Sequence, residues 1–206
     1  MADAQSQGGR LWPRTISFAC GVGMICASIL TIRHYFDANF PTSIFEGSFC
    51  DLNAFFNCDS SAYSEISQLG GVPLGYFGLV VGALVCLGAL FPSLPLERTN
   101  KSIALLNGIG VVVLLVYSVV WLGSLCLLCT AYYVASLLSL WVFWRYDIDG
   151  NEGSFLSRFA RPSLKHLTVA AVVTGFGAYG FAAFHSAKED AQSGAVATRI
   201  VDQYFS

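Results

Sequence analysis

Apolar residues run through this chain in long stretches. Four intervals contain no Asp, Glu, Lys or Arg, namely 15–32, 66–96, 102–144 and 166–187. A helix that crosses a bilayer needs about 20 mainly apolar residues. The third interval has 43 residues, enough for two crossings, and Gly123 and Ser124 stand near its middle, where a tight turn would fall. The pattern therefore predicts five transmembrane helices, at about 13–35, 73–92, 101–122, 125–145 and 165–185.

The segments around these helices complete the predicted organisation. Residues 1–146 would form a four-helix bundle, and a polar linker at 147–164 would lead to the fifth helix at 165–185. The tail at 186–206 is too short for a domain of its own. The first helix is longer than the apolar core of a signal peptide, so we expect it to be retained.

Composition and charge narrow the class of protein. The chain is 55% apolar and only 12% charged, against roughly 25% charged residues in an ordinary soluble domain. This excludes a soluble globular enzyme, a disordered chain and a coiled coil. A net charge of −2 without a basic patch also excludes a nucleic-acid binder. The prediction is an all-α, multi-pass membrane protein.

Lys and Arg are unevenly divided between the two sides that five crossings define. Eight lie on the side of the amino terminus and three on the other, and the positive-inside rule places the richer side in the cytoplasm. The loop at 36–72 and the tail then face outward, and this loop has five acidic residues and no basic one. Within the loop, Asp59-Ser-Ser is a good N-cap cluster and predicts a short helix at about 59–68.

Three of the seven cysteines lie within the first two predicted helices. Cys20, Cys26 and Cys86 are expected to be small packing residues. Gly78 and Gly82 lie on the same helix as Cys86, and small residues at that spacing allow two helices to approach closely. This observation agrees with a packing role.

The other four cysteines are predicted to lie together at the outer face. Cys50 and Cys58 are in the outer loop, and Cys126-Leu-Leu-Cys129 opens the fourth helix, which starts on the same side. Disulfides persist on this side of a membrane. Three interpretations are open: structural disulfides, a four-cysteine zinc site, and thiol–disulfide exchange.

The spacing of these cysteines favours exchange. A bridge between Cys126 and Cys129 would close a loop of only two residues and add little stability. Seven residues separate Cys50 from Cys58, which does not fit the two to four of a zinc knuckle, so no metal site is expected. Cys-x-x-Cys is the spacing that exchange chemistry uses, and a helix amino terminus favours the reactive thiolate.

Several further residues occur around the cysteines in a recognisable order. Along the chain the set is Cys50-x7-Cys58, Ser64, Pro-Leu-Gly-Tyr-Phe-Gly at 73–78, and Cys126-Leu-Leu-Cys129-x3-Tyr133. Together these resemble the vitamin K epoxide reductase (VKOR) family over roughly residues 12–146. The resemblance implies a four-helix bundle around a quinone, capped by the first loop, with a fifth helix as in many bacterial members.

The resemblance also implies a role for each residue. Cys126 and Cys129 would be the active-site pair, with Cys129 attacking the quinone. Cys58 would exchange with Cys126, and Cys50 with a protein partner. Three further residues would contact the quinone: Ser64, Phe77 and Tyr133. Without the resemblance, Ser64 would be read as a solvated hydroxyl and Tyr133 as a packing aromatic.

One position departs from the animal members of the family. Leu74 stands where they carry an asparagine that contacts the quinone, as in the bacterial branch. This favours a simple quinone, of the ubiquinone, menaquinone or phylloquinone type, over an epoxide. Asn107 is another polar group in the bundle, which interhelical hydrogen bonding would explain. Many bacterial members carry a thioredoxin-like domain after the fifth helix. The tail here has no Cys-x-x-Cys, so we expect either a thioredoxin-fold, DsbA-like partner in trans or such a domain beyond residue 206.

The expected function is that of a quinone-dependent thiol–disulfide oxidoreductase that supports oxidative protein folding. It would lie in a bacterial inner membrane, with the active-site cysteines and the carboxyl terminus in the periplasm. Electrons would pass from the partner through Cys50/Cys58 and Cys126/Cys129 to the quinone. The rival from another class is a non-catalytic membrane protein with structural disulfides or a cysteine metal site. A DsbB-type oxidase is disfavoured because it carries its Cys-x-x-Cys near the first hairpin.

Overall fold

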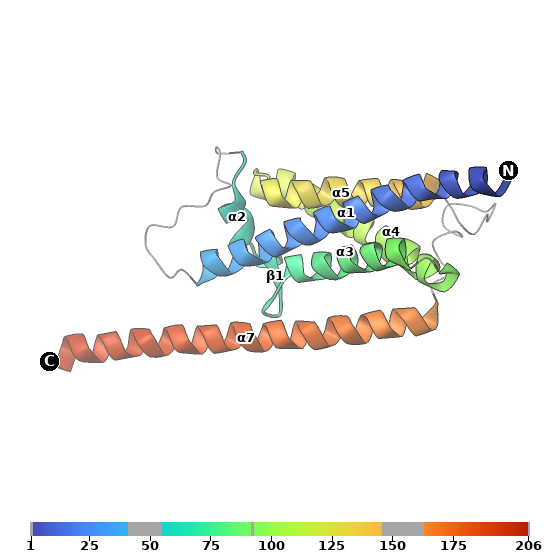
Figure 1. Cartoon of the computed structure of the whole chain (residues 1–206). Coiled ribbons are helices and arrows are strands. Elements are labelled where there is room, and N and C mark those ends of the chain that lie inside the picture. The colour runs from blue at the N-terminus through green and yellow to red at the C-terminus, as the bar shows by residue number, and fades with distance from the viewer. Residues whose placement is uncertain (1, 41–54, 92, 146–162, 206) are drawn as a thin grey trace.

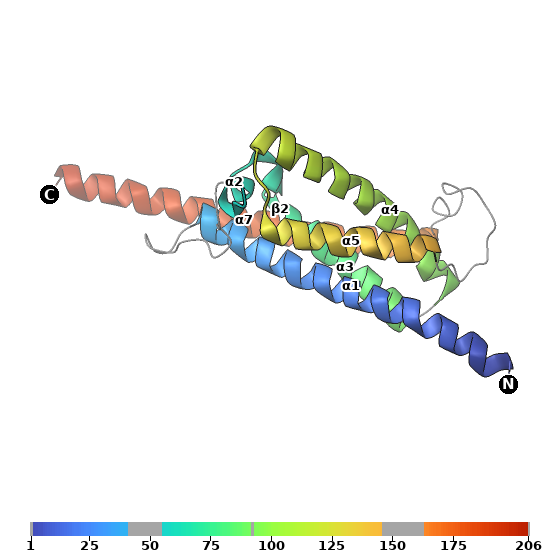
Figure 2. The same cartoon turned by 90° about the horizontal axis from the view of Figure 1, so that it is seen from above.

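The computed structural model describes residues 2–40, 55–91, 93–145 and 163–205. Five long helices make up most of this part of the chain: α1 (Ala2–Asn39), α3 (Leu74–Leu90), α4 (Leu94–Tyr117), α5 (Leu127–Arg145) and α7 (Leu164–Phe205). The first four form a bundle, and α7 lies along one side of it (Figure 1). Seen from above, α4 is inclined to α1 and α5 (Figure 2).

Four segments are long and apolar enough to cross a membrane, namely Leu11–Asn39, Leu94–Leu122, Leu127–Arg145 and Leu164–Gly194. The predicted fold class, an all-α membrane protein, is confirmed. Helix α3 is apolar but has only 17 residues, which is about 26 Å at 1.5 Å per residue. It is therefore slightly shorter than a hydrocarbon core of about 30 Å.

Several helix boundaries differ from those predicted. Helix α1 begins at Ala2 and α4 at Leu94, both earlier than the apolar stretch requires. Pro95 lies in the first turn of α4, a position that proline favours. The residues expected to form a tail continue α7 to Phe205, because alanine recurs along this segment and no proline interrupts it.

One end of the bundle is covered by the segment 55–73, which we call the cap (Figure 1). It contains α2 (Cys58–Ala62), the 3-10 helix η1 (Glu65–Ser67), and the hairpin of β1 (Gln68–Leu69) and β2 (Val72–Pro73). The helix expected at about 59–68 is thus replaced by two shorter ones. The chain reverses through Gly70 and Gly71, whose positive φ angles of 60° and 80° suit a two-residue hairpin turn.

The turn predicted between the third and fourth spans is confirmed. After α4 the chain continues as a short π-helix, η2 (Ser118–Leu122), and ends at Gly123 in the left-handed conformation with φ of 63°. Glycine adopts this conformation without steric cost. The chain then enters α5 at Leu127, on the same side of the bundle as the cap.

Helices α1 and α3 pack closely because glycines line their contact. A Cβ atom on Gly21 would lie 2.6 Å from the Sγ of Cys86 and 3.0 Å from the carbonyl oxygen of Gly82. A Cβ atom on Gly78 would lie 2.8 Å from the Oγ of Ser28. The close approach that the spacing of Gly78 and Gly82 predicts is therefore present.

We expect Gly21→Ala to destabilise the bundle. The added methyl group would collide with backbone atoms of α3 as well as with Cys86, and overpacking of this kind costs about 1–3 kcal/mol. A thermal melt in detergent should show a midpoint several degrees lower. The matched control is Gly175→Ala on α7, where an added Cβ would meet nothing within 4 Å. An equal melting temperature for both variants would contradict this account of the packing.

Helix α7 is attached to the bundle by two polar contacts. The hydroxyl of Tyr76 donates to the carbonyl oxygen of Thr174 at 3.0 Å, beside Gly177, where a side chain would collide with the ring. Farther along, buried His185 lies with its Nε2 3.0 Å from the hydroxyl of Tyr35. These contacts fix α7 against α3, α1 and the cap.

Candidate active site

Main-chain pairing joins the two segments that carry reactive cysteines. An isolated parallel bridge pairs Phe56 with Leu125. The N–H of Asn57 donates to the carbonyl oxygen of Leu125 at 3.1 Å. The N–H of Leu125 in turn donates to the carbonyl oxygen of Phe55 at 2.7 Å. A backbone pairing of this kind sets the relative position of the residues that follow each strand. Cys58 and Cys126 are those residues.

Cys58 and Cys126 lie in sulfur-to-sulfur contact. Cys58 is the first residue of α2, fully buried and disulfide-bonded. Cys126 is a reduced cysteine with 4% of its surface exposed. Its Sγ lies 3.4 Å from the Sγ of Cys58. Exchange proceeds by attack of a thiolate on a disulfide sulfur, and these two sulfurs are close enough for it.

Cys126 occupies the N-cap position of α5. Its carbonyl oxygen accepts the N–H of Thr130 at 2.9 Å, and its Sγ accepts the N–H of Cys129 at 3.3 Å. A side chain that accepts from the third helical residue is the usual N-cap arrangement. The hydrogen bond and the helix dipole both favour negative charge on this sulfur. Cys126 therefore lies where charge that develops on an exchanging sulfur would be stabilised, directly against Cys58.

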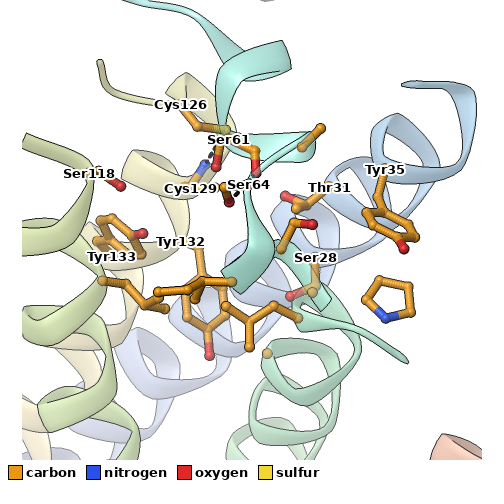
Figure 3. Close-up of a pocket in the computed structure, with 18 of the residues that line it drawn as sticks. Ser28, Thr31, Tyr35, Ser61, Ser64, Ser118, Cys126, Cys129, Tyr132 and Tyr133 are labelled. Carbon is orange, nitrogen blue, oxygen red and sulfur yellow. Dashed lines mark hydrogen bonds between the residues drawn. The ribbon is translucent and has the colours of Figure 1, made fainter. Parts of the chain in front are cut away.

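Cys129 is also a reduced cysteine and lies deeper, within the first turn of α5. Its sulfur is beside Cys126 and the hydroxyl of Ser61 from α2 (Figure 3). Three of the four predicted site cysteines, Cys58, Cys126 and Cys129, thus form a continuous row from the cap into the bundle. Cys50, the fourth predicted site cysteine, lies outside the described residues.

We expect Asn57→Ala to slow exchange between Cys58 and Cys126. Asn57 caps α2 by accepting the N–H of Ser60 at 2.8 Å, and loss of an N-cap costs about 1 kcal/mol, equivalent to roughly a 5-fold effect. In a Cys129→Ala background, formation of the Cys58–Cys126 disulfide can be followed by alkylation and peptide mapping. Asn57→Ser retains an N-cap side chain and should restore the rate, whereas equal rates for both variants would contradict this role.

A pocket of about 230 Å³ lies directly below the cysteines. Helices α1, α3, α4 and α5 and the cap all contribute side chains to its wall. Apolar groups predominate, including Leu74, Phe77, Val111, Leu114 and Leu122. Cys58, Cys126 and Cys129 also line it. The pocket therefore joins the cysteine row to an apolar space between the helices (Figure 3).

The three residues predicted to contact a quinone all line this pocket: Ser64, Phe77 and Tyr133. Ser64 lies at the cap, and its hydroxyl donates to the carbonyl oxygen of Ser61 at 2.8 Å. Tyr133 lies on α5 next to the hydroxyl of Ser118 (Figure 3). The structure brings them to one space with the cysteines.

Other polar residues of the pocket were not singled out as site residues from the sequence. Ser28 on α1 is 2% exposed, and its Oγ has no hydrogen-bond partner. His34, also on α1, has its Nε2 3.1 Å from a carboxylate oxygen of Asp59 in the cap. Nothing in the local sequence marks either residue, because the face that α1 turns to the pocket depends on where the other helices lie.

Asn107 has the interhelical role expected of it. Its Nδ2 donates to the hydroxyl of Ser136 at 2.6 Å, and its Oδ1 accepts from the hydroxyl of Tyr132 at 2.8 Å. These bonds cross from α4 to α5. Asn107 lines the pocket, but both ends of its side-chain amide are engaged in joining the two helices.

Three cysteines of the described residues lie outside the site. Cys20 and Cys86 are buried packing residues, whereas Cys26 is exposed on the surface of α1. Among the residues that the structure describes, no group of three or more His, Cys, Asp or Glu could hold a metal ion.

The family profile of the vitamin K epoxide reductase (VKOR) family matches residues 14–144. This chain belongs to that family. The match covers all four helices of the bundle and the cap. The VKOR protein described here is accordingly an integral membrane thiol oxidoreductase. Searches among curated proteins and among solved structures gave no match.

Proposed function

We propose that this VKOR-family protein generates disulfides by passing electrons from a reduced thioredoxin-fold partner to a quinone. The observation that carries the proposal is the 3.4 Å contact between the Sγ of reduced Cys126 and the Sγ of disulfide-bonded Cys58. A disulfide that only stabilises the fold does not require a second cysteine sulfur in contact with it. An exchange relay requires one.

The proposed relay has two steps within the chain. The partner's two thiols become a disulfide as the Cys50–Cys58 disulfide becomes two thiols. The Cys58 thiolate then attacks Cys126 of a Cys126–Cys129 disulfide and releases the Cys129 thiolate, and Cys50 resolves the mixed disulfide by attacking Cys58. Cys126 and Cys129 are left reduced, which is their state in the structure, while Cys58 is disulfide-bonded.

The pocket fits a quinone. Aromatic and aliphatic side chains would hold the ring, namely Phe77, Leu74, Val111 and Leu114. The Oγ of Ser28 is a buried polar atom without a partner, of the kind that a carbonyl oxygen would satisfy. A bound quinone would take up the two electrons and two protons that return Cys126 and Cys129 to a disulfide. The cap excludes water from Cys58, which is fully buried.

The proposal includes an orientation in the membrane and a division of the chain. The excess of basic residues on the amino-terminal side supports a cytoplasmic amino terminus and a periplasmic cap in a bacterial inner membrane. Residues 1–146 would be the redox bundle, followed by the linker at 147–164 and the fifth span at 165–185. A DsbA-like partner would then meet the cap from the periplasm.

An assay of quinone-dependent substrate oxidation tests the proposed function. The protein is reconstituted in lipid nanodiscs with a reduced thioredoxin-fold substrate and either a short-chain ubiquinone or menadione. One substrate disulfide should form for each quinol. Alkylation measures the loss of substrate thiols, and absorbance measures the loss of quinone. Unchanged substrate thiols and an unchanged count of protein thiols after quinone addition would instead favour structural cysteines.

A further inference from the structure

The hydroxyl of Ser28 is unusual among the side chains of α1. It is buried, and its oxygen has no hydrogen-bond partner. Serine and threonine within helices commonly donate to the carbonyl group four residues earlier. Thr31, one turn farther along the same helix, does so to Ala27 at 2.8 Å. Because an unpartnered buried hydroxyl reduces stability, the position of Ser28 calls for an explanation.

Ser28 lines the pocket at the place where α1 meets α3 (Figure 3). Its Oγ lies against Gly78, since a Cβ atom there would be only 2.8 Å away. The α3 residues that line the pocket beside it include Leu74 and Phe77, which have no polar side-chain group. The absence of a side chain at Gly78 thus leaves room for the hydroxyl of Ser28 beside the apolar side chains of α3.

Three other hydroxyl groups of the pocket donate within the protein. That of Thr31 donates to Ala27, that of Ser64 to the carbonyl oxygen of Ser61, and that of Tyr132 to Asn107. Ser28 differs from these three because its donor is available to an occupant of the pocket. An apolar pocket with an available donor on its wall is suited to a flat, apolar molecule that carries a carbonyl oxygen.

We propose that Ser28 is a quinone-binding residue whose hydroxyl donates a hydrogen bond to a carbonyl oxygen of the bound ring. The inference rests on the proposed function. Ser28 approaches from α1, whereas Cys129 and Tyr133 approach from α5 on the other side of the pocket (Figure 3). A para-quinone has carbonyl groups at its two ends. Ser28 would hold one end and thereby orient the other toward Cys129.

Binding of two matched probes tests this role. The full chain is fully oxidised, so that no electrons flow, and is titrated calorimetrically with menadione or with 2-methylnaphthalene, which has a similar ring system without carbonyl groups. Ser28→Ala should weaken menadione binding by about 3- to 10-fold, the effect of one neutral hydrogen bond. Binding of 2-methylnaphthalene should be unchanged.

Ser139→Ala is the control because it makes the same chemical change elsewhere. Ser139 on α5 is also buried with an unpartnered hydroxyl, but it does not line the pocket. The Ser139→Ala variant should bind both probes with the affinity of the unmodified protein. The melting temperature without probe should not fall in Ser28→Ala, because alanine removes a hydroxyl that has no partner.

Unchanged menadione affinity in Ser28→Ala would overturn the inference, and so would an equal loss for 2-methylnaphthalene or in Ser139→Ala. A lower melting temperature together with weaker binding of both probes would assign Ser28 a structural role instead. If the unmodified protein oxidises its substrate with quinone but Ser28→Ala binds normally, only the role of Ser28 is lost. If the unmodified protein neither binds menadione nor oxidises substrate with it, the proposed function falls as well.

Discussion

Replacing Cys129 with alanine is expected to abolish quinone reduction while leaving Cys58 able to exchange. Cys126 would still lie beside the Cys58 disulfide, at the 3.4 Å seen in the structure. It could no longer form a disulfide with a neighbour in α5, so the pair of electrons would have no route from the active-site cysteines to the pocket. Quinol formation should fall to background, measured as loss of quinone absorbance with dithiothreitol as the reductant.

The matched control for this prediction is Cys26→Ala. Cys26 is a free cysteine on α1 that is exposed and does not line the pocket, so quinol formation should be unchanged. Mixed disulfides between the cap cysteines and the partner should still be trapped in Cys129→Ala. Quinol production that survives in Cys129→Ala would remove this residue from its proposed role.

Cys50→Ala is expected to separate two sources of electrons. Without Cys50, the protein partner loses its point of entry, and oxidation of a thioredoxin-fold substrate should stop. Dithiothreitol is small enough to reduce Cys126–Cys129 directly, so quinone reduction with this reagent should continue. The measurement is quinol formation with each reductant in turn, and only the rate with the protein substrate should fall to background.

A different result for Cys50→Ala would assign the cap cysteines another role. If the rate of quinol formation falls equally with both reductants, the disulfide at Cys58 holds the cap in place and carries no electrons. A thermal melt of the variant distinguishes these cases further, because loss of a structural disulfide typically costs about 2–5 kcal/mol.

The helices of the bundle could be predicted because their signals are local. Stretches without charge mark α1, α4, α5 and α7, and Gly123 marks the turn before α5. The family could also be predicted, because its cysteines and aromatic residues keep a fixed order in the sequence, and the match over residues 14–144 confirms it.

The cap could be predicted only in outline. Asp59-Ser-Ser indicates a helix start, but the residue that caps α2 is Asn57, and the helix ends after five residues. Its length is set by the bridge to Leu125 and by the hairpin that follows. These are contacts between distant parts of the chain, which a local N-cap signal does not contain.

The polar residues of the pocket were hardest to foresee. Ser28 and His34 lie on a long apolar helix, where hydrophobicity around the whole circumference hides the face that turns inward. In the structure, the direction of Ser28 is defined by its contact with Gly78. The pairing of His34 with Asp59 likewise depends on where the cap lies.

The close packing at the glycines between α1 and α3 restricts substitution on that wall of the pocket, whereas the α4 wall has room for larger side chains. At Gly78 any added side chain would strike Ser28 and Tyr132, whereas at Gly110, on the α4 wall, an added Cβ would meet nothing within 4 Å. Efforts to retune this protein toward larger or smaller ring systems should therefore begin at Gly110 and its α4 neighbours. The opposite wall tolerates no such remodelling.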